Sequence, residues 1–557
     1  MKDSIHIIPL GGIGSVTKNM FLYEYRVDGL LHDILLVDCG IGFPDPEMYG
    51  VDLVIPDIRY LKDKKKFIRG LVFTHGHDDH IGAIPYLYPE LGRIPMWATK
   101  LTAAFANIKL KEARIADRVK PISFDDQLTI GPFRVSFVRV THSVPDTSNL
   151  IIETPIGIFY HGSDFKFDPT PLDAKVSEIS KINAAGRRGV LCLLTDSLGS
   201  ERPGQTPSEQ TIGQTIEREL AIAPGKVLFT TQSSNISRIQ LAIELALRHK
   251  RSIIFLGRSI DQNVEEAVKL AYMRFPRETL IRDRDLKRVP RTKQFLVVAG
   301  SQGQPGSALS RIANDAHRFV HLEEGDTVIF SADPIPGREN DVNNLIDQIY
   351  RKGARVSYSD IMEDLHVSGH GSQVDLMLLL SALGPQFVFP IGGTYRHLMQ
   401  YRRLAQELGY DKRDVLIPEE GEVLEFRAGA RPHIAGRIDL ENVMVDGLGV
   451  GDVGNVVLRD RQTIATEGIV VVVLPIEKST GRMMSQPDII SRGFIFMKQS
   501  GALLKQARHV VSQSIRLKKG RMLDWQFVRR QIEENLARFL REETGRSPLI
   551  VPVIVEV

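Results

Sequence analysis

The chain has 557 residues, of which 43% are hydrophobic and 25% are charged, and its formal net charge is +3. This length exceeds what one hydrophobic core can hold, so we expect several domains of roughly 150 residues. The composition excludes a disordered or fibrous chain, and no run approaches the ~18 apolar residues of a membrane span. Cys39 and Cys192 lie in apolar strand-like runs, which argues against a disulfide framework, and the N-terminal apolar run is too short for a signal peptide. We therefore expect a cytoplasmic protein with no membrane attachment.

Short apolar runs alternate with polar loops over residues 1–208, which predicts a domain rich in β-strands. Each run stops at a polar residue that can bind a metal. The runs are ILLVDCG (34–40), GLVFTHGHDDH (70–80), FRVSFVRVTHS (133–143), GIFYHGSDF (157–165) and VLCLLTDS (190–197).

A different rhythm of strand followed by helix begins at Lys226, as in KVLFTTQSSN before IQLAIELALRH, and predicts a parallel α/β domain inserted over residues 209–355. Backbone amides and hydroxyls at such strand ends form anion sites suited to phosphates. On these motifs alone, a generic nucleotide-binding domain is the alternative. The residues concerned are Ser233, Ser234 and Asn235, then Gly257, Arg258 and Ser259, and then Gly300, Ser301, Gln302 and Gly303.

The last two hundred residues predict three further parts. Strands and polar loops return over residues 356–430, as though the interrupted first domain were being completed. Residues 431–460, which include MVDGLGVGDVGN, are expected to form a connecting region because they are rich in Gly and Asp. Residues 461–557 contain the strand run GIVVVVLPI, the amphipathic run WQFVRRQIEENLARFLREE and the closing run LIVPVIVEV, which predict a small α/β domain.

The strongest chemical signal is the cluster HxHxDH at residues 75–80, which directly follows the strand run LVF. Imidazole nitrogens and carboxylate oxygens at this spacing suit zinc, and a pair of metals can lower the pKa of a water and stabilise a leaving oxygen. Asp38, His142 and Asp164 end other strands, and strand ends on one edge of a sheet converge in space. Each of these three alone could be a loop cap, but together with the cluster they complete one metal site and most of a second. The cluster residues are His75, His77, Asp79 and His80.

This set of residues resembles that of the metallo-β-lactamase superfamily, whose fold is an αββα sandwich. The resemblance implies two Zn²⁺ per subunit, which Mn²⁺ or Mg²⁺ could replace. It implies that His75, His77 and His142 bind one zinc, that Asp79 and His80 bind the other, and that Asp164 bridges the two. Asp38 matches a position that orients the ligands without touching the metal.

The insertion resembles a β-CASP domain, and segments such as PLGGIG, GSQGQP, HVSGHGSQ and VDGLGVGDVGN are similar to the ribonuclease J family along nearly the whole chain. The expected fold is therefore an α/β chain with a metallo-β-lactamase sandwich, an inserted parallel α/β β-CASP domain and a small α/β C-terminal domain. The resemblance implies 5′ to 3′ exonuclease and endonuclease activity on single-stranded RNA, in mRNA decay and in the maturation of rRNA and other RNA 5′ ends. It also implies a homodimer or a dimer of dimers, in which a ribonuclease J paralogue could take part.

The same resemblance assigns roles outside the metal cluster. Asp79 and Asp196 match acidic residues of the reaction centre. For Asp196, the alternative to a catalytic role is that its side chain caps a helix. His370 matches a histidine that protonates the leaving oxygen, a role suited to imidazole. Residues near the 5′-phosphate pocket are matched by Ser331, His366, Ser368, Gly369 and His370, with ordinary loop hydrogen bonding as the alternative.

The sequence departs from the family where ribonuclease J typically reads PVHGE. Here Gly392 stands at the position of the histidine ligand and Thr394 at that of the glutamate, so the second metal loses a side chain and should bind more weakly. His397 could substitute only through a rearranged loop, the alternative being a histidine at a helix start.

This departure sustains a rival hypothesis, a weakly active or inactive RNA-binding subunit that supports an active paralogue. The intact HGHDDH motif argues against it. A hydrolase of small esters or thioesters is disfavoured by the phosphate-binding insertion. The basic stretch at residues 516–521 could contact RNA, although a solvated charged face is the simpler interpretation.

Overall fold

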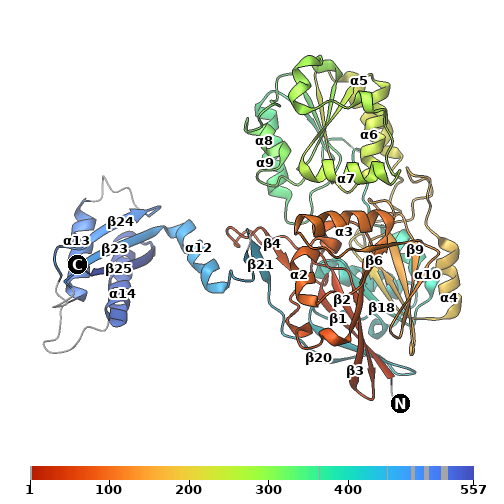
Figure 1. Ribbon diagram of the computed structural model, residues 1–557, viewed down its shortest axis with the longest axis horizontal. Coiled ribbons are helices and arrows are strands. Elements are labelled where there is room, and N and C mark those ends of the chain that lie inside the picture. The colour runs from red at the N-terminus through yellow and green to blue at the C-terminus, as the bar shows by residue number, and fades with distance from the viewer. Residues whose placement is uncertain are drawn as a thin grey trace. The chain divides into compact units, whose positions relative to one another are not determined.

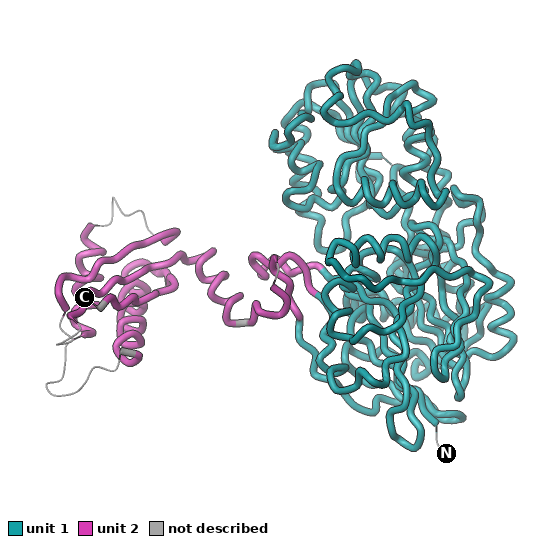
Figure 2. The backbone as a smooth tube through the Cα atoms, in the orientation of Figure 1, with its two compact units in different colours: residues 1–42, 55–442 teal, residues 43–54, 443–557 magenta. Residues whose placement is uncertain are grey.

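A computed structural model of the chain describes residues 3–362, 364–447, 449–477, 483–494, 501–515 and 525–556. The chain divides into two compact units, residues 1–42 with 55–442 and residues 43–54 with 443–557 (Figure 2). The basic stretch at residues 516–521 lies outside the described residues, so its contact with RNA stays a prediction.

Two mixed β-sheets form the centre of the first unit (Figure 1). The first sheet has the order β20 (His433–Arg437), β19 (Glu422–Arg427), β1 (Asp3–Gly11), β2 (Met20–Val27), β3 (Leu30–Val37), β5 (Ile68–Val72), β6 (Met96–Thr99) and β7 (Lys120–Ile122). The second has the order β18 (Phe387–Ile391), β12 (Val190–Asp196), β11 (Gly157–Gly162), β10 (Ser148–Thr154), β9 (Phe133–Arg139) and β8 (Gln127–Ile130).

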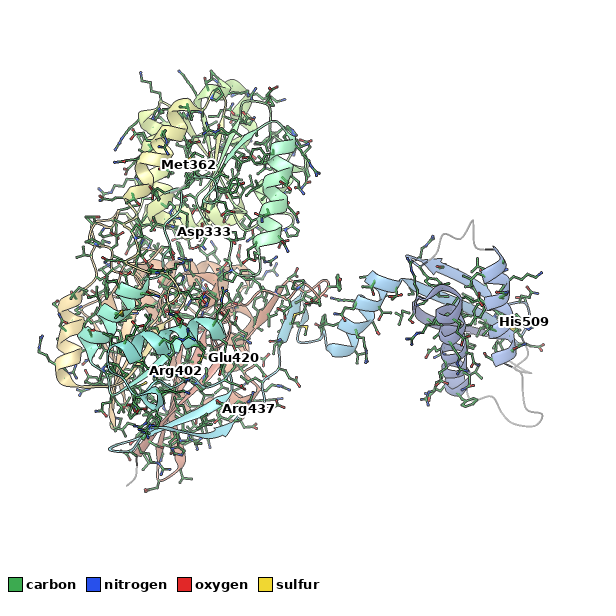
Figure 3. All side chains as sticks on the ribbon, turned by 180° about the vertical axis from the view of Figure 1, so that it is seen from behind. Asp333, Met362, Arg402, Glu420, Arg437 and His509 are labelled. Carbon is green, nitrogen blue, oxygen red and sulfur yellow. The ribbon has the colours of Figure 1, made fainter. Side chains whose placement is uncertain are left out.

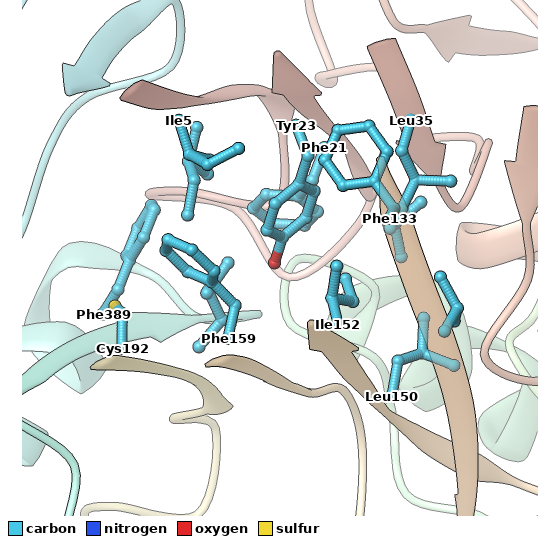
Figure 4. Close-up of a cluster of buried hydrophobic side chains, with 14 of the residues drawn as sticks. Ile5, Phe21, Tyr23, Leu35, Phe133, Leu150, Ile152, Phe159, Cys192 and Phe389 are labelled. Carbon is cyan, nitrogen blue, oxygen red and sulfur yellow. The ribbon is translucent and has the colours of Figure 1, made fainter. Parts of the chain in front are cut away.

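A continuous hydrophobic core fills the space between these sheets. Large aromatic side chains from both sheets, among them Phe21, Phe133, Phe159 and Phe389, are almost completely buried in it (Figure 4). The first sheet carries α2 (Ile84–Leu91) and α3 (Lys100–Glu112) on its outer face. A second core lies on the outer face of the other sheet, below α4 (Ile179–Arg188), α10 (Gln373–Leu383) and α11 (Tyr395–Glu407). This order of layers confirms the expected αββα sandwich.

An α/β domain interrupts the sandwich between β12 and β18. Its sheet is parallel, in the order β14 (Ser252–Leu256), β15 (Gln294–Val298), β13 (Val227–Thr230), β16 (Thr327–Phe330) and β17 (Arg355–Ser357). The helices on its two sides are α5 (Thr211–Ile222), α6 (Ile236–Arg248), α7 (Arg258–Lys269), α8 (Ala308–Ala313) and α9 (Glu339–Arg351) (Figure 1). The parallel α/β character predicted for the insertion is confirmed.

The second unit ends in a small α/β fold. Its sheet has the order β24 (Asp488–Arg492), β23 (Ile469–Ile476) and β25 (Leu549–Glu556), and one face packs on α13 (Gly501–Ser514) and α14 (Trp525–Thr544). Every second residue of β23 is buried, as expected for a strand with one covered face. Among the described helices of the chain, none is both long enough and apolar enough to cross a membrane.

Residues 431–460 differ from the connecting region that their composition suggested. They contain β20, which extends the first sheet of the sandwich, as well as β21 (Val443–Asp446), β22 (Gly449–Val450) and the start of α12 (Asn455–Glu467). The strands β22 and β21 share a small sheet with β4 (Leu53–Ile55). Glycine and aspartate serve here as turn residues between short paired strands, as at Gly447, whose backbone has a positive φ.

Candidate metal and catalytic site

The predicted site residues follow strands whose ends meet at one edge of the sandwich. Asp38 follows β3 and the segment 74–80 follows β5, and these two strands are parallel neighbours. Asp164 follows β11 and Asp196 ends β12, which are parallel neighbours in the other sheet. Because parallel strands end on the same side, each sheet delivers its polar residues to one place. The structure thus brings together side chains from segments more than a hundred residues apart.

Four of these side chains form the first ligand group. Nδ1 of His77 lies 3.1 Å from Nε2 of His75 and 3.1 Å from Nε2 of His142. Oδ2 of Asp164 lies 3.5 Å from Nε2 of His75 and 3.7 Å from Nε2 of His142. In a tetrahedral zinc site with ligands at the usual distance, ligand atoms are about 3.3 Å apart. The spacing of these four atoms therefore fits zinc.

In His142 and His77, the ring nitrogen that points away from the other ligand atoms has a hydrogen-bond partner of its own. The Nδ1–H of His142 donates to the backbone oxygen of Gly369 at 2.7 Å, which leaves Nε2 free to bind a metal. Nε2 of His77 lies 3.0 Å from the hydroxyl of Ser143. Burial, together with the neighbouring histidines, lowers the pKa of His77 and of His142 well below the usual value. Both imidazoles are thus neutral, which is the form that binds metals.

Asp79, His80 and Asp164 form a second group, which shares Asp164 with the first. Nε2 of His80 lies 3.6 Å from Oδ2 of Asp79 and 3.5 Å from Oδ2 of Asp164. Burial raises the pKa of Asp79. Although burial opposes a charged ring, the carboxylates of Asp164, Asp79 and Asp38 raise the pKa of His80 well above its usual value. Such a buried surplus of negative charge fits a bound cation.

Asp38 positions the metal-binding loop through hydrogen bonds to Thr74 and His80. Its carboxylate accepts hydrogen bonds from the backbone nitrogen and the hydroxyl of Thr74, both at 2.8 Å, and from Nδ1 of His80 at 2.8 Å. Asp38 is fully buried and has a φ of 61°, which aspartate tolerates better than most residues. These bonds fix the start of the HGHDDH loop and turn Nε2 of His80 toward the second group.

Asn19 is a neighbour of the cluster that sequence reasoning missed. Its side-chain nitrogen lies 3.1 Å from Nε2 of His80 and 3.2 Å from the backbone oxygen of Val16. The residue lies in the segment KNMF (18–21), directly before β2, and no chemical role was predicted for it. A lone asparagine at the start of a strand carries no spacing signal that could have assigned one.

Gly392 faces this cluster but adds no ligand. It has a φ of 65°, and a Cβ atom built on it would lie 3.9 Å from Oδ1 of Asp164 and 3.8 Å from Oδ1 of Asp196. His397 does not fill the space, because its ring closes a capping box with Thr394 at the start of α11. The other ring nitrogen of His397 lies 3.4 Å from Glu201. Of the two interpretations of His397, the structure favours the histidine at a helix start.

We expect His397→Ala to lower the free energy of unfolding by about 1–2 kcal/mol, because it removes half of a capping box. The metal content should not change. Chemical denaturation and elemental analysis of the purified variant measure the two quantities. Loss of one metal per chain would instead make His397 a ligand.

Asp196 and His370 form a third group with Asp164. The Nδ1–H of His370 donates to Oδ2 of Asp196 at 2.7 Å, and Nε2 of His370 lies 4.0 Å from Oδ2 of Asp164. Burial disfavours the charged ring, but the carboxylates of Asp196 and Asp164 outweigh it and raise the pKa of His370 to about 9. Asp196 also accepts from the backbone nitrogen of Leu198, so it combines a turn-stabilising bond with the contact to His370.

The residues matched to a phosphate pocket gather around the loop before α10, but most already have partners. The hydroxyl of Ser331 is buried and donates to the backbone oxygen of Leu365 at 2.7 Å. That of Ser368 accepts from the backbone nitrogen of His370. Gly369 packs so closely on His142 that a Cβ atom would lie 2.8 Å from the ring. Of the polar strand ends expected to bind anions, Asn235 caps α6 through a bond from the backbone nitrogen of Arg238.

Four family models match successive parts of the chain. They are the metallo-beta-lactamase superfamily over residues 29–207, the ribonuclease J beta-CASP domain over 224–349, the Zn-dependent metallo-hydrolase RNA specificity domain over 358–418 and the ribonuclease J C-terminal domain over 456–557. A solved structure of a protein of unknown function from Enterococcus faecalis covers 76% of this chain and all of its own, with a TM-score of 0.52 and 15% identity. That similarity concerns the fold alone.

Curated relatives align with the chain from end to end. Ribonuclease J2 of Bacillus subtilis is 38% identical, covering 100% of this chain and 99% of its own. Ribonuclease J 1 of Streptococcus pyogenes is 37% identical over 99% of this chain and 98% of its own length. Ribonuclease J of Thermus thermophilus is 37% identical over 100% of this chain and 96% of its own length. The chain therefore belongs to the ribonuclease J family, metal-dependent hydrolases that combine a metallo-β-lactamase sandwich with an inserted β-CASP domain.

Proposed function

We propose that the chain is a zinc-dependent ribonuclease that degrades single-stranded RNA from its 5′ end and also cleaves it internally. The observation that carries this proposal is that two adjacent ligand groups share Asp164, and that Nε2 of His370 lies 4.0 Å from the carboxylate of this residue. The names of the relatives support RNA as the substrate. In keeping with the resemblance, we place the activity in cytoplasmic mRNA decay and RNA 5′-end maturation.

His75, His77, His142 and Asp164 would hold one zinc ion, and Asp79, His80 and Asp164 a second. When bound, the pair would supply Lewis acidity toward a phosphodiester and lower the pKa of a water. His370 would carry a proton on Nε2 for the leaving 3′ oxygen, because Asp196 fixes its Nδ1–H. Ser368 and Gly369 would hold the loop that carries His370, and His366 would face the 5′ phosphate of the RNA.

The proposal also includes the domain boundaries that the sequence predicts, and it includes the assembly of the protein. The sandwich would comprise residues 1–208 and 356–430 together with the added strand β20, the β-CASP domain residues 209–355, and the C-terminal domain residues 461–557. Self-association through the C-terminal domain would give a homodimer or a dimer of dimers.

The absence of a side chain at Gly392 favours a second candidate, a weakly active or inactive RNA-binding subunit that supports an active paralogue. Within the described part of the chain, the second ligand group has three members, Asp79, His80 and Asp164, so its affinity for metal should be lower than that of the four-membered first group. Metal content distinguishes the candidates. About two zinc ions per chain, with cleavage that does not need added Mn²⁺, identifies the enzyme, whereas one ion per chain with RNA binding but little cleavage identifies the subunit.

Removal of metal tests the proposal as a whole. After treatment with a chelator and gel filtration, we expect cleavage of 5′-monophosphorylated single-stranded RNA to disappear and to return on addition of Zn²⁺. The free energy of unfolding should rise by about 2.7 kcal/mol for each site when Zn²⁺ is present at a hundred times the dissociation constant of that site. Protein that is free of metal, indifferent to chelators and still able to degrade RNA contradicts the proposal.

A further inference from the structure

Arg238, near the start of α6, is almost completely buried and uses every N–H donor of its guanidinium. Nε and Nη2 donate to both carboxylate oxygens of Glu209 at 2.7–3.1 Å. Nη2 also donates to the backbone oxygen of Val367 at 2.8 Å. Nη1 donates to the backbone oxygen of Ser331 at 2.8 Å and to Nδ1 of His366 at 2.7 Å. One side chain thus fastens three segments that are far apart in the sequence.

Glu209 connects this arginine to the sandwich. Its carboxylate also accepts from Nζ of Lys166, which is fully buried, at 3.2 Å. Lys166 lies two residues after Asp164, and its backbone is bonded to Thr141, the residue before His142. Despite burial, the positive charges of Arg238 and Lys166 lower the pKa of Glu209, so its carboxylate stays charged. The ion chain Lys166–Glu209–Arg238 therefore runs from the segments that carry Asp164 and His142 to the loop that carries His366 and His370.

The contact with Arg238 also determines where His366 carries its proton. A guanidinium can donate hydrogen bonds but cannot accept them, so Nδ1 of His366 must be the acceptor. The proton of the neutral ring then resides on Nε2, which lies 3.6 Å from Oδ2 of Asp333. Asp333 follows β16, at the end of the inserted domain that faces the sandwich (Figure 3). Burial and the charge of Arg238 lower the pKa of His366 to about 4, in agreement with a neutral ring.

We propose that Arg238 is a positioning residue for the reaction, which holds the loop of residues 365–370 in place and keeps His366 as the neutral Nε2–H tautomer. This inference rests on the proposed ribonuclease function and adds two things to it. His366 offers a fixed N–H donor rather than a positive charge to an anionic group of the substrate. Arg238 also sets the distance between the Nε2–H donor of His366 and His370, because it bonds to His366 and Val367, which lie in the same loop as His370.

Arg238→Lys tests the proposal, because lysine keeps the charge but cannot bond to Glu209, Ser331, His366 and Val367 together. We expect the catalytic efficiency on single-stranded RNA to fall about 100-fold, mainly through kcat, since small displacements of reacting groups have effects of this size. The matched control is Arg251→Lys. Arg251 is also buried and donates to the backbone oxygens of Gly225, Ala223 and Gln294, away from the site. It should lose stability but retain the kinetic constants.

The tautomer of His366 is measured by nitrogen NMR of protein with ¹⁵N-labelled histidine, without RNA, and its signals are assigned by their absence in His366→Gln. We expect an unprotonated Nδ1 and a protonated Nε2 in the wild type and in Arg251→Lys, and a loss of this preference in Arg238→Lys. A wild-type ring protonated on Nδ1, or on both nitrogens, overturns the proposal even if Arg238→Lys does not fold. Kinetic constants of Arg238→Lys equal to those of Arg251→Lys also overturn it. Because the spectra require no cleavage, they remain decisive if the protein proves not to be a ribonuclease.

Discussion

Asp164→Asn is expected to lose both metal ions and to reduce kcat for RNA cleavage about 1000-fold or more. Among the residues that the structure describes, three groups of side chains are able to hold a cation, and Asp164 is the residue common to all three. Burial opposes its charge, but His80 and His370 outweigh burial and hold its pKa well below the usual value. An amide has the same shape but lacks this charge, and Lewis-acid assistance contributes several kcal/mol to such reactions.

Three measurements separate this result from simple misfolding. Elemental analysis should show less than one metal ion per chain, circular dichroism should show the wild-type secondary structure, and affinity for single-stranded RNA should largely persist. Asp57→Asn is the matched control, because Asp57 is also a buried carboxylate of the sandwich but bonds to Arg59 away from the cluster. Asp57→Asn should retain metal and activity. An Asp164→Asn protein that keeps two metal ions and cleaves RNA normally would show that the ligand assignment is wrong.

Sequence patterns predicted a strand-rich first domain, the α/β insertion and the cluster because each depends on local signals, whereas the αββα sandwich was implied by the family resemblance. Apolar runs of strand length that stop at a polar residue identify the carboxyl ends of strands, and the structure places Asp38, Asp164 and Asp196 at such ends. The HGHDDH loop has a spacing that few purely structural loops would share. These features are short in sequence, so one chain without an alignment is enough to find them.

The partners behind the site could not be predicted in this way. The ion chain through Lys166, Glu209 and Arg238 joins residues up to seventy-two positions apart, and no spacing in the sequence links the three. Their role depends on their burial. Charged residues are usually exposed, and only the fold shows that these three side chains are buried. Likewise, Ser331 and Ser368 were candidates for phosphate contacts because of their residue type, whereas the structure shows which hydrogen bonds they already make.

His370→Ala is expected to lower kcat by about 10²- to 10⁴-fold, the usual contribution of a general acid, with the metal content unchanged. Asp196→Asn should act on the same proton in a different way. Asp196 is the main group that raises the pKa of His370 to about 9 against the effect of burial. The protonated ring is therefore abundant below that pH and is lost as the pH rises through it. Without the carboxylate, burial prevails and the pKa falls.

The ratio of Asp196→Asn activity to wild-type activity, measured from pH 6 to pH 9, tests this assignment. At pH 8 the Asp196→Asn variant should be slower than the wild type by about tenfold for each unit by which the pKa of its His370 lies below pH 8. The ratio of the two activities should therefore rise as the pH is lowered. Using the ratio cancels the loss of metal that both proteins share in acid. His370→Ala provides the control, because without an imidazole its ratio to wild type should show no such recovery at low pH. A ratio for Asp196→Asn that does not change with pH would mean that Asp196 acts only on structure, and that the proton for the leaving oxygen comes from another group.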